Sequence, residues 1–198
     1  MNKSFYGRHV RPMVRSDWTP WRLCPSEEIY HVLEPSGGIE LEALEFLKAL
    51  VLVCKPETIL ELGSGTGAGT AALASGVKEN ECGHVYSIDI NPESVRSTVS
   101  FLANAGLGDY ATVLHADSKD MGWTFGLIDL LFVDSGFERA DDIKRFYRYL
   151  SSRAIIVCHD GADPQYGFAT CAEFERVLLP TPTGLLVMQA KRLGIGLL

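Results

Sequence analysis

A glycine-rich turn behind a short apolar run is the feature that most constrains the fold of this chain. In the segment ILELGSGTGAGT, residues 59–70, glycine occupies every second position from Gly63 to Gly69. Glycine loses more conformational entropy on folding than any other residue, so such a cluster indicates a backbone that turns sharply or approaches a ligand closely. The apolar residues before the turn are typical of a buried strand, and TAALASGV after it is typical of a helix.

Strand and helix patterns alternate along the rest of the chain. Further strands are predicted at residues 84–90, 110–116, 127–134 and 154–160. Helices are predicted within residues 39–56, where Pro56 stops the apolar run, after Asn91-Pro92, at residues 140–150 and around residues 170–179, and a closing hairpin at residues 184–198. Strands that alternate with helices form a parallel sheet covered on both faces. The sequence therefore predicts a doubly wound α/β fold.

Composition places the chain among single-domain globular proteins. Its 198 residues suit one domain, with residues 1–37 as an N-terminal arm and residues 38–198 as the core. Residues 1–25 contain five Lys or Arg and one Asp, whereas the whole chain has a net charge of −7, so the core is acidic. An acidic core disfavours a nucleic-acid partner. Scattered cysteines and the lack of a long apolar run favour the cytoplasm and disfavour a membrane.

Polar side chains follow each of five successive predicted strands. They belong to the glycine turn, Asp89, Asp117 with Ser118, Asp134, and His159 with Asp160. Each one alone is explained by the capping of a turn or helix. In a doubly wound sheet, however, the carboxyl ends of the strands share one edge, and ligands bind there. The convergence of all these groups on that edge predicts a ligand site.

The residues around the glycine turn narrow the class of ligand. No lysine follows the turn, which excludes the phosphate loop Gly-x-x-x-x-Gly-Lys-Ser/Thr. Gly63, Gly65 and Ala68 fit the dinucleotide pattern Gly-x-Gly-x-x-Gly/Ala. Glu61, two residues before the first glycine, would repel a pyrophosphate and attract an ammonium or sulfonium group. The sequence therefore favours a ligand that is positively charged at this end.

With these residues the chain resembles the class I S-adenosylmethionine-dependent methyltransferases. The segments LELGSGTG, VYSIDIN, HADS and IDLLFVD carry the resemblance, which covers about residues 38–160. It implies a Rossmann-like, mostly parallel seven-stranded sheet of order 3-2-1-4-5-7-6 whose last strand is antiparallel. It also implies S-adenosyl-L-methionine as the cofactor. The implied cofactor-binding residues are Glu61, Gly63, Ser64, Gly65 and Gly67 for the methionine part, Asp89 for the ribose, Asp117 and Ser118 for the adenine, and also Ile90 and Asp134.

Within that superfamily the chain is similar to small-molecule O-methyltransferases of the catechol type and to relatives that modify sugars and antibiotics. In this group the acids after strands four and five often hold a divalent metal ion, and Asp134 and Asp160 match two of the ligand positions. The third ligand position, an asparagine in the family, is Gly161 here. The position of the family's Lys or His base is Phe137. Both departures leave the use of a metal ion such as Mg²⁺ in question.

A hydroxyl acceptor needs a general base, and we assign that role to His159 with Asp160, because both follow strand five and imidazole titrates near neutral pH. The expected partner is a small-molecule acceptor, and a homodimer stays open. Two other classes also stay open. An NAD(P)-dependent oxidoreductase is disfavoured by Glu61, whereas a cofactor-binding module without catalysis is compatible with Phe137 and Gly161.

Overall fold

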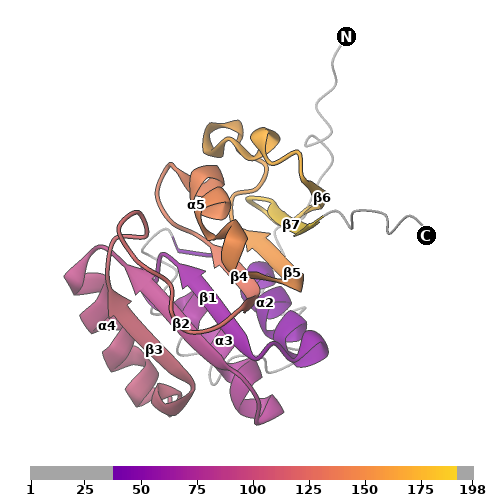
Figure 1. Cartoon of the computed structure of the whole chain (residues 1–198). Coiled ribbons are helices and arrows are strands. Elements are labelled where there is room, and N and C mark those ends of the chain that lie inside the picture. The colour runs from indigo at the N-terminus through magenta and orange to yellow at the C-terminus, as the bar shows by residue number, and fades with distance from the viewer. Residues whose placement is uncertain (1–37, 191–198) are drawn as a thin grey trace.

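The computed structural model describes residues 38–190. The predicted arm at residues 1–37, and residues 191–198 of the predicted closing hairpin, lie outside this range. Within it the chain forms a seven-stranded sheet of order β3-β2-β1-β4-β5-β7-β6 with helices on both faces (Figure 1). The strands are β1 (Thr58–Leu62), β2 (His84–Asp89), β3 (Ala111–His115), β4 (Ile128–Val133), β5 (Leu150–Cys158), β6 (Phe174–Leu179) and β7 (Leu185–Ala190).

Within residues 38–190, three α-helices cover one face of the sheet and a fourth covers the other. They are α2 (Leu41–Cys54), α3 (Ala68–Asn80) and α4 (Pro92–Asn104) on the first face and α5 (Arg139–Phe146) on the second. Short 3-10 helices are η4 (Gly108–Tyr110), η5 (Tyr147–Tyr149), η6 (Pro164–Tyr166) and η7 (Phe168–Thr170). No helix in this part of the chain combines the length and hydropathy that a membrane span requires.

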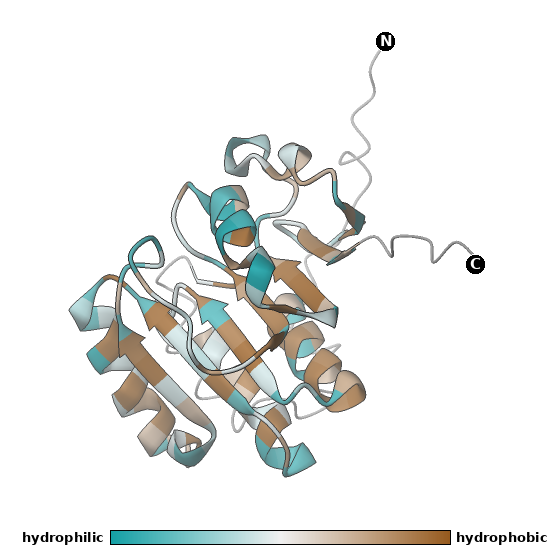
Figure 2. Ribbon diagram, viewed as in Figure 1, coloured by the Kyte–Doolittle hydropathy of each residue, from teal (hydrophilic) through white to brown (hydrophobic). Residues whose placement is uncertain are grey.

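A hydrophobic core fills the space between each face of the sheet and its helices. On one face, Leu47 of α2 and Leu73 of α3 belong to a core with Ile59 of β1. On the other face, Ile143 of α5 belongs to a second core with Leu131 of β4. Figure 2 shows hydrophobic residues concentrated on the strands and on α2, whereas α5 is largely hydrophilic. Burial on both faces explains why the strands have nearly continuous apolar sequences.

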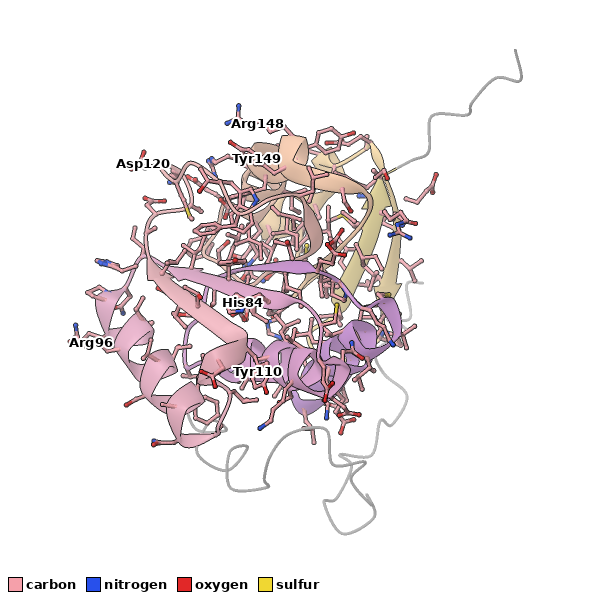
Figure 3. The ribbon with its side chains drawn as sticks, turned by 60° about the horizontal axis from the view of Figure 1, so that its bottom comes forward. His84, Arg96, Tyr110, Asp120, Arg148 and Tyr149 are labelled. Carbon is pink, nitrogen blue, oxygen red and sulfur yellow. The ribbon has the colours of Figure 1, made fainter. Side chains whose placement is uncertain are left out.

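The two faces of the sheet can be compared in Figure 3. Arg96 of α4 and Tyr110 of η4 lie on one side of the sheet, and Asp120 and Tyr149 lie on the other. The loop that carries Asp120 and the helix pair α5–η5 therefore cover the face opposite to α4. This loop takes the place that a helix between β3 and β4 would occupy in a regular alternation of strands and helices.

Strand directions create a crevice beside β1. Strands β1 to β5 are parallel, whereas β7 runs antiparallel to both β5 and β6. The chain adds β2 and β3 on one side of β1 and β4 and β5 on the other. The connections therefore diverge at the carboxyl end of β1, which is where such sheets bind ligands. The predicted strand order and the antiparallel last strand are confirmed.

The prediction of a helix around residues 170–179 is wrong. Residues Phe174–Leu179 form β6, which pairs in antiparallel register with β7, so the terminal hairpin consists of β6 and β7. The turn between them lies in the segment PTPTG, residues 180–184, where Gly184 has φ +80° and its N–H donates to the Thr181 carbonyl at 3.0 Å. The helical spacing of apolar residues is overridden here, because β7 offers an edge of unpaired backbone groups.

A glycine at the end of the sheet opposite to the crevice provides a test of this fold. Gly83 has φ +92°, and a Cβ there would lie 2.2 Å from the backbone oxygen of Pro56. Gly83→Ala should therefore lower the free energy of unfolding by about 1–3 kcal/mol, measured by urea denaturation. Gly122→Ala is the matched control, because a Cβ at Gly122 meets nothing within 4 Å. Equal stability of the two variants would contradict the described path of the chain at Gly83.

Candidate active site

The glycine turn passes directly over the ends of β2 and β4. The Gly63 N–H donates to the Ile88 carbonyl at 2.8 Å, and a Cβ on Gly63 would lie 2.4 Å from the Asp134 backbone oxygen. Gly65 also has a positive φ, but a Cβ there would meet nothing within 4 Å. Gly63 is thus required for close backbone packing, whereas Gly65 faces open space. Gly67, at φ +92°, turns the chain into α3.

Asp89, at the end of β2, is bound to this turn. One carboxylate oxygen accepts hydrogen bonds from the Gly65 N–H at 2.9 Å and from the Ser64 hydroxyl at 3.3 Å. The other oxygen accepts from the Asn91 N–H at 2.8 Å. The carboxylate therefore joins β2 to the glycine turn and fixes the start of α4.

Two adjoining cavities open along the carboxyl ends of the strands. The first has a volume of about 430 Å³ and is lined by Asp89 and Ile90, among others, and the second has a volume of about 340 Å³ and is lined by Glu61. Gly63, Gly65 and Asp134 line both cavities. The two cavities are therefore parts of one groove, and the predicted site residues lie along it, except Gly67, which lines neither of these two cavities. Asp117 and Ser118 line the first cavity, and Ser64, His159 and Asp160 line the second.

The side chains of Asp117 and Ser118 also have local roles. Asp117 accepts a hydrogen bond from the Lys119 N–H at 2.9 Å, and Ser118 donates to the Asp142 carboxylate at 2.8 Å. Asp142 in turn accepts a hydrogen bond from Ser135, at 2.8 Å, in the loop after β4. These bonds hold the loops after β3 and β4 together as one wall of the first cavity.

Glu61 is a buried carboxyl group at the floor of the second cavity. It is 1% exposed and accepts hydrogen bonds from the hydroxyls of Ser87, at 2.5 Å, and Thr70. A Cβ on Gly69 would lie 2.4 Å from Glu61 Oε1, so the glycine leaves room for this carboxyl. Burial raises the pKa of Glu61 to about 7, against the lowering effect of these hydrogen bonds, and Asp134 contributes a further increase. A cation in the groove would favour the ionised form.

His159 lies between two carboxylates. Its Nδ1 is 3.2 Å from Asp134 Oδ1, and its Nε2 is hydrogen-bonded to Glu40, just before α2. Thr183 approaches Nε2 at 3.1 Å and donates to the same Glu40 carboxylate. Burial alone would lower the pKa of His159. The hydrogen bonds to Asp134 and Glu40 outweigh this effect and raise the pKa to about 10. The hydrogen bonds of the His159 ring therefore connect the residues that precede α2 to the end of β4.

This geometry does not support the predicted role of His159 as a general base. Both ring nitrogens are bound to carboxylates, so neither presents a lone pair to a substrate. The sequence showed the imidazole at the correct strand end but not its partners. Glu40 is 119 residues away along the chain, and this long-range contact left no local signal.

Arg139, the first residue of α5, completes the cluster and was missed by the sequence analysis. Its side chain is 6% exposed, and its Nη2 lies 3.1 Å from Asp134 Oδ1 and 3.2 Å from Asp160 Oδ2. Nε donates to the Ser135 carbonyl at 2.8 Å and Nη1 to the His159 carbonyl at 2.5 Å. The one available signal was an arginine five residues after Asp134, just before two acids in the first turn of a predicted helix.

Comparison with known proteins identifies the family. Residues 60–161, more than half of the chain, match the family described as a methyltransferase domain. The chain belongs to this methyltransferase family. The matched segment contains the glycine turn, Asp89, Asp134 and Asp160, so the family match and the groove coincide. The resemblance to class I methyltransferases is confirmed.

Relatives of this methyltransferase differ in their named reactions. This chain is 27% identical over 126 residues to a probable cobalt-precorrin-6B C(15)-methyltransferase (decarboxylating) of Methanothermobacter thermautotrophicus. The match covers 64% of this chain and 63% of that protein. This chain is 24% identical over 138 residues to an O-methyltransferase of Aspergillus hancockii, covering 68% of this chain and 54% of that protein. The chain therefore spans less than two thirds of the length of either relative.

A solved structure shares the fold. The O-methyltransferase from Bacillus cereus in complex with SAH superimposes with a TM-score of 0.70 at 18% identity, covering 83% of this chain and 90% of that chain. At this identity the likeness concerns the fold. It agrees with the strand order of the methyltransferase described above.

The buried carboxyl of Glu61 leads to a pH-dependent prediction. A carboxyl whose pKa is raised in the folded state, to about 7, destabilises the fold as pH rises from about 4.5 through 7. Glu61→Gln removes this loss, so the variant should gain stability relative to the parent over that range, on the order of 3 kcal/mol. Thermal unfolding at a series of pH values measures the difference. Glu175→Gln, at an exposed position of β6, is the control. A stability difference between Glu61→Gln and the parent that does not change with pH would contradict the burial of an ionisable group.

Proposed function

We propose that this methyltransferase transfers the methyl group of S-adenosyl-L-methionine to a hydroxyl oxygen of a small molecule. The proposal is based on the placement of acidic and apolar side chains along the groove. One end offers the Asp89 carboxylate beside the exposed side chain of Ile90, and the other offers the acids Glu61 and Asp134. A nucleoside with free ribose hydroxyls and a cationic tail is complementary to such a groove.

The residues present fit this cofactor. Asp89 would accept hydrogen bonds from the ribose hydroxyls, and Ile90, Asp117 and Ser118 would line the adenine end. Glu61 and Asp134 would face the ammonium and sulfonium charges, and the open space at Gly65 lets the ligand approach the backbone. When bound, the cofactor supplies an electrophilic methyl group. The protein has to align the acceptor with that group and keep water away.

An aromatic surface at the mouth of the groove indicates the class of acceptor. Phe137 lines the first cavity with 75% of its surface exposed, and its ring stacks on Tyr166 with centroids 6.5 Å apart and planes 20° from parallel. Exposed rings beside a polar cavity favour planar acceptors. We therefore propose a small aromatic alcohol, such as a phenol, as the acceptor.

Asp160 is the group that we propose to receive the acceptor's proton. Its carboxylate is part-exposed and lines the second cavity, with Tyr166 Oη at 3.5 Å. As the acceptor oxygen takes up the methyl group that the cofactor would supply, its hydroxyl proton would pass to the Asp160 carboxylate and then to water. His159 holds the neighbouring Asp134 in place and takes no part in proton transfer.

Calorimetry followed by a turnover assay tests the function. S-adenosylmethionine and S-adenosylhomocysteine should bind saturably, whereas NADH should not, because Glu61 and Asp134 oppose a pyrophosphate. Incubation with a panel of phenols and catechols should then produce S-adenosylhomocysteine. Tight binding of NADH alone would indicate an oxidoreductase. Binding of S-adenosylmethionine without turnover of any acceptor would indicate a binding module.

The Asp89 carboxylate should dominate cofactor affinity. Asp89→Ala removes charge-assisted hydrogen bonds worth about 1.5–3 kcal/mol each, so the Kd for S-adenosylhomocysteine should rise at least tenfold. Asp89→Asn keeps an accepting oxygen and should show a smaller loss, and Asp109→Ala, in η4 at the far end of the sheet, is the control. A folded Asp89→Ala protein with a Kd within twofold of the parent would remove Asp89 from the site.

Phe137 should contribute to binding of the acceptor and not of the cofactor. Its truncation in Phe137→Ala removes one ring of the stack, worth about 0.5–1.5 kcal/mol, so KM for an aromatic acceptor should rise about two- to tenfold. Steady-state kinetics measures KM, and calorimetry should show an unchanged cofactor Kd. Phe125→Ala serves as control, because Phe125 stacks on Tyr86 away from the acceptor side. An unchanged KM for every aromatic acceptor would place the acceptor elsewhere.

A further inference from the structure

The metal site that the catechol-type resemblance implies lacks its third ligand for a structural reason. Asp134 and Asp160 stand at two of the ligand positions, and Gly161 stands at the third. A Cβ on Gly161 would lie 2.6 Å from the backbone nitrogen and 2.4 Å from the Cβ of Leu186 in β7. An asparagine therefore does not fit at this position without movement of β7, and the fold itself excludes the ligand.

A guanidinium group bridges the two acids that remain. Nη2 of Arg139 lies 3.1 Å from Asp134 Oδ1 and 3.2 Å from Asp160 Oδ2. It therefore occupies the position between the two carboxylates that a metal ion bound to both would need. The group is held there by the carbonyls of Ser135 and His159 and by the ring of Tyr166, 3.9 Å from the guanidinium carbon. Arginine carries its charge at every pH at which proteins fold.

His159 does not compensate for the missing ligand. Ligand atoms of Asp134, His159 and Asp160 lie within 4.8 Å of one another, a spacing that suits a metal ion. Both ring nitrogens of His159, however, are bound to carboxylates, and Asp134 Oδ1 serves His159 and Arg139 together. A divalent ion would have to displace a buried guanidinium and lie close to its positive charge. Mg²⁺ usually binds one or two carboxylates and keeps several waters, but both carboxylates here are already paired with the Arg139 guanidinium.

We propose that the Arg139 guanidinium takes the place of the divalent metal ion, so that this methyltransferase works without one. Arg139 is a positioning residue in this account: it holds the Asp134 and Asp160 carboxylates at the groove and supplies a fixed positive charge beside them. The inference rests on the proposed methyl transfer for its catalytic meaning. The exclusion of the ion from the cluster can be measured without any acceptor.

Titration of Mn²⁺ into the EDTA-treated chain, followed by calorimetry, tests the proposal. The parent should show no saturable binding at millimolar Mn²⁺. Arg139→Ala releases both carboxylates from the guanidinium and should bind Mn²⁺ saturably, with a Kd at least tenfold below the highest concentration at which the parent shows no binding, and adding Asp134→Asn should abolish this binding. Arg139→Met keeps most of the aliphatic stem without the guanidinium and replaces Arg139→Ala if that variant does not fold, as judged by circular dichroism.

Two results would overturn the proposal. One is saturable Mn²⁺ binding to the parent that Asp134→Asn abolishes. The other is a folded Arg139→Met chain that still binds no Mn²⁺, because the guanidinium would then not be what keeps the ion out. Once an acceptor is known, EDTA should leave turnover of the parent unchanged. Failure to find any acceptor would count against the proposed function, while the ion titrations would still decide the role of Arg139.

Discussion

The close approach of Gly63 to the Asp134 backbone is the contact on which the groove depends. The Asp134 N–H donates to the Leu62 carbonyl at 2.9 Å, and the space above Gly63 leaves no room for a Cβ against the Asp134 oxygen. The ends of β1 and β4 are thereby locked together at the point where the chain turns into α3. Asp89 on one side and Asp134 on the other then face the same cavity system. A side chain at residue 63 would separate the two halves of the groove.

A second constraint is charge compensation at the same edge. Three carboxylates, those of Glu40, Asp134 and Asp160, surround the side chains of His159 and Arg139. Burial alone would raise the pKa of Glu40. The hydrogen bond from His159 outweighs this effect and lowers the pKa to about 2, so the acid stays ionised. Removal of one partner from such a buried network leaves an uncompensated charge, which costs more than the pair contributes. The cluster therefore fixes the residues before α2, the end of β4 and the start of α5 relative to one another.

Much of this arrangement could be predicted from local sequence. The glycine turn, the strand runs and the Asn91 cap of α4 depend on residues close together in the chain, and the structure has all three. The strand nature of β6 was missed, because pairing with β7 is a tertiary effect that outweighs apolar spacing. Glu40 and Arg139 were missed because their importance comes from partners far away in sequence. The hydrogen bonds of His159 to Asp134 and Glu40 were not predicted for the same reason, since both partners are far away in sequence.

We propose that one groove takes the nucleoside cofactor between Asp89 and Asp134, beside a guanidinium and not a metal ion. A crystal structure of the chain grown with S-adenosylhomocysteine and Mn²⁺, with anomalous data collected for manganese, tests it most directly. We expect ribose hydroxyls within hydrogen-bonding distance of the Asp89 carboxylate. We also expect the Arg139 guanidinium between Asp134 and Asp160, with no anomalous peak there. A nucleoside bound outside the groove, or a manganese ion bridging these two acids, would contradict it.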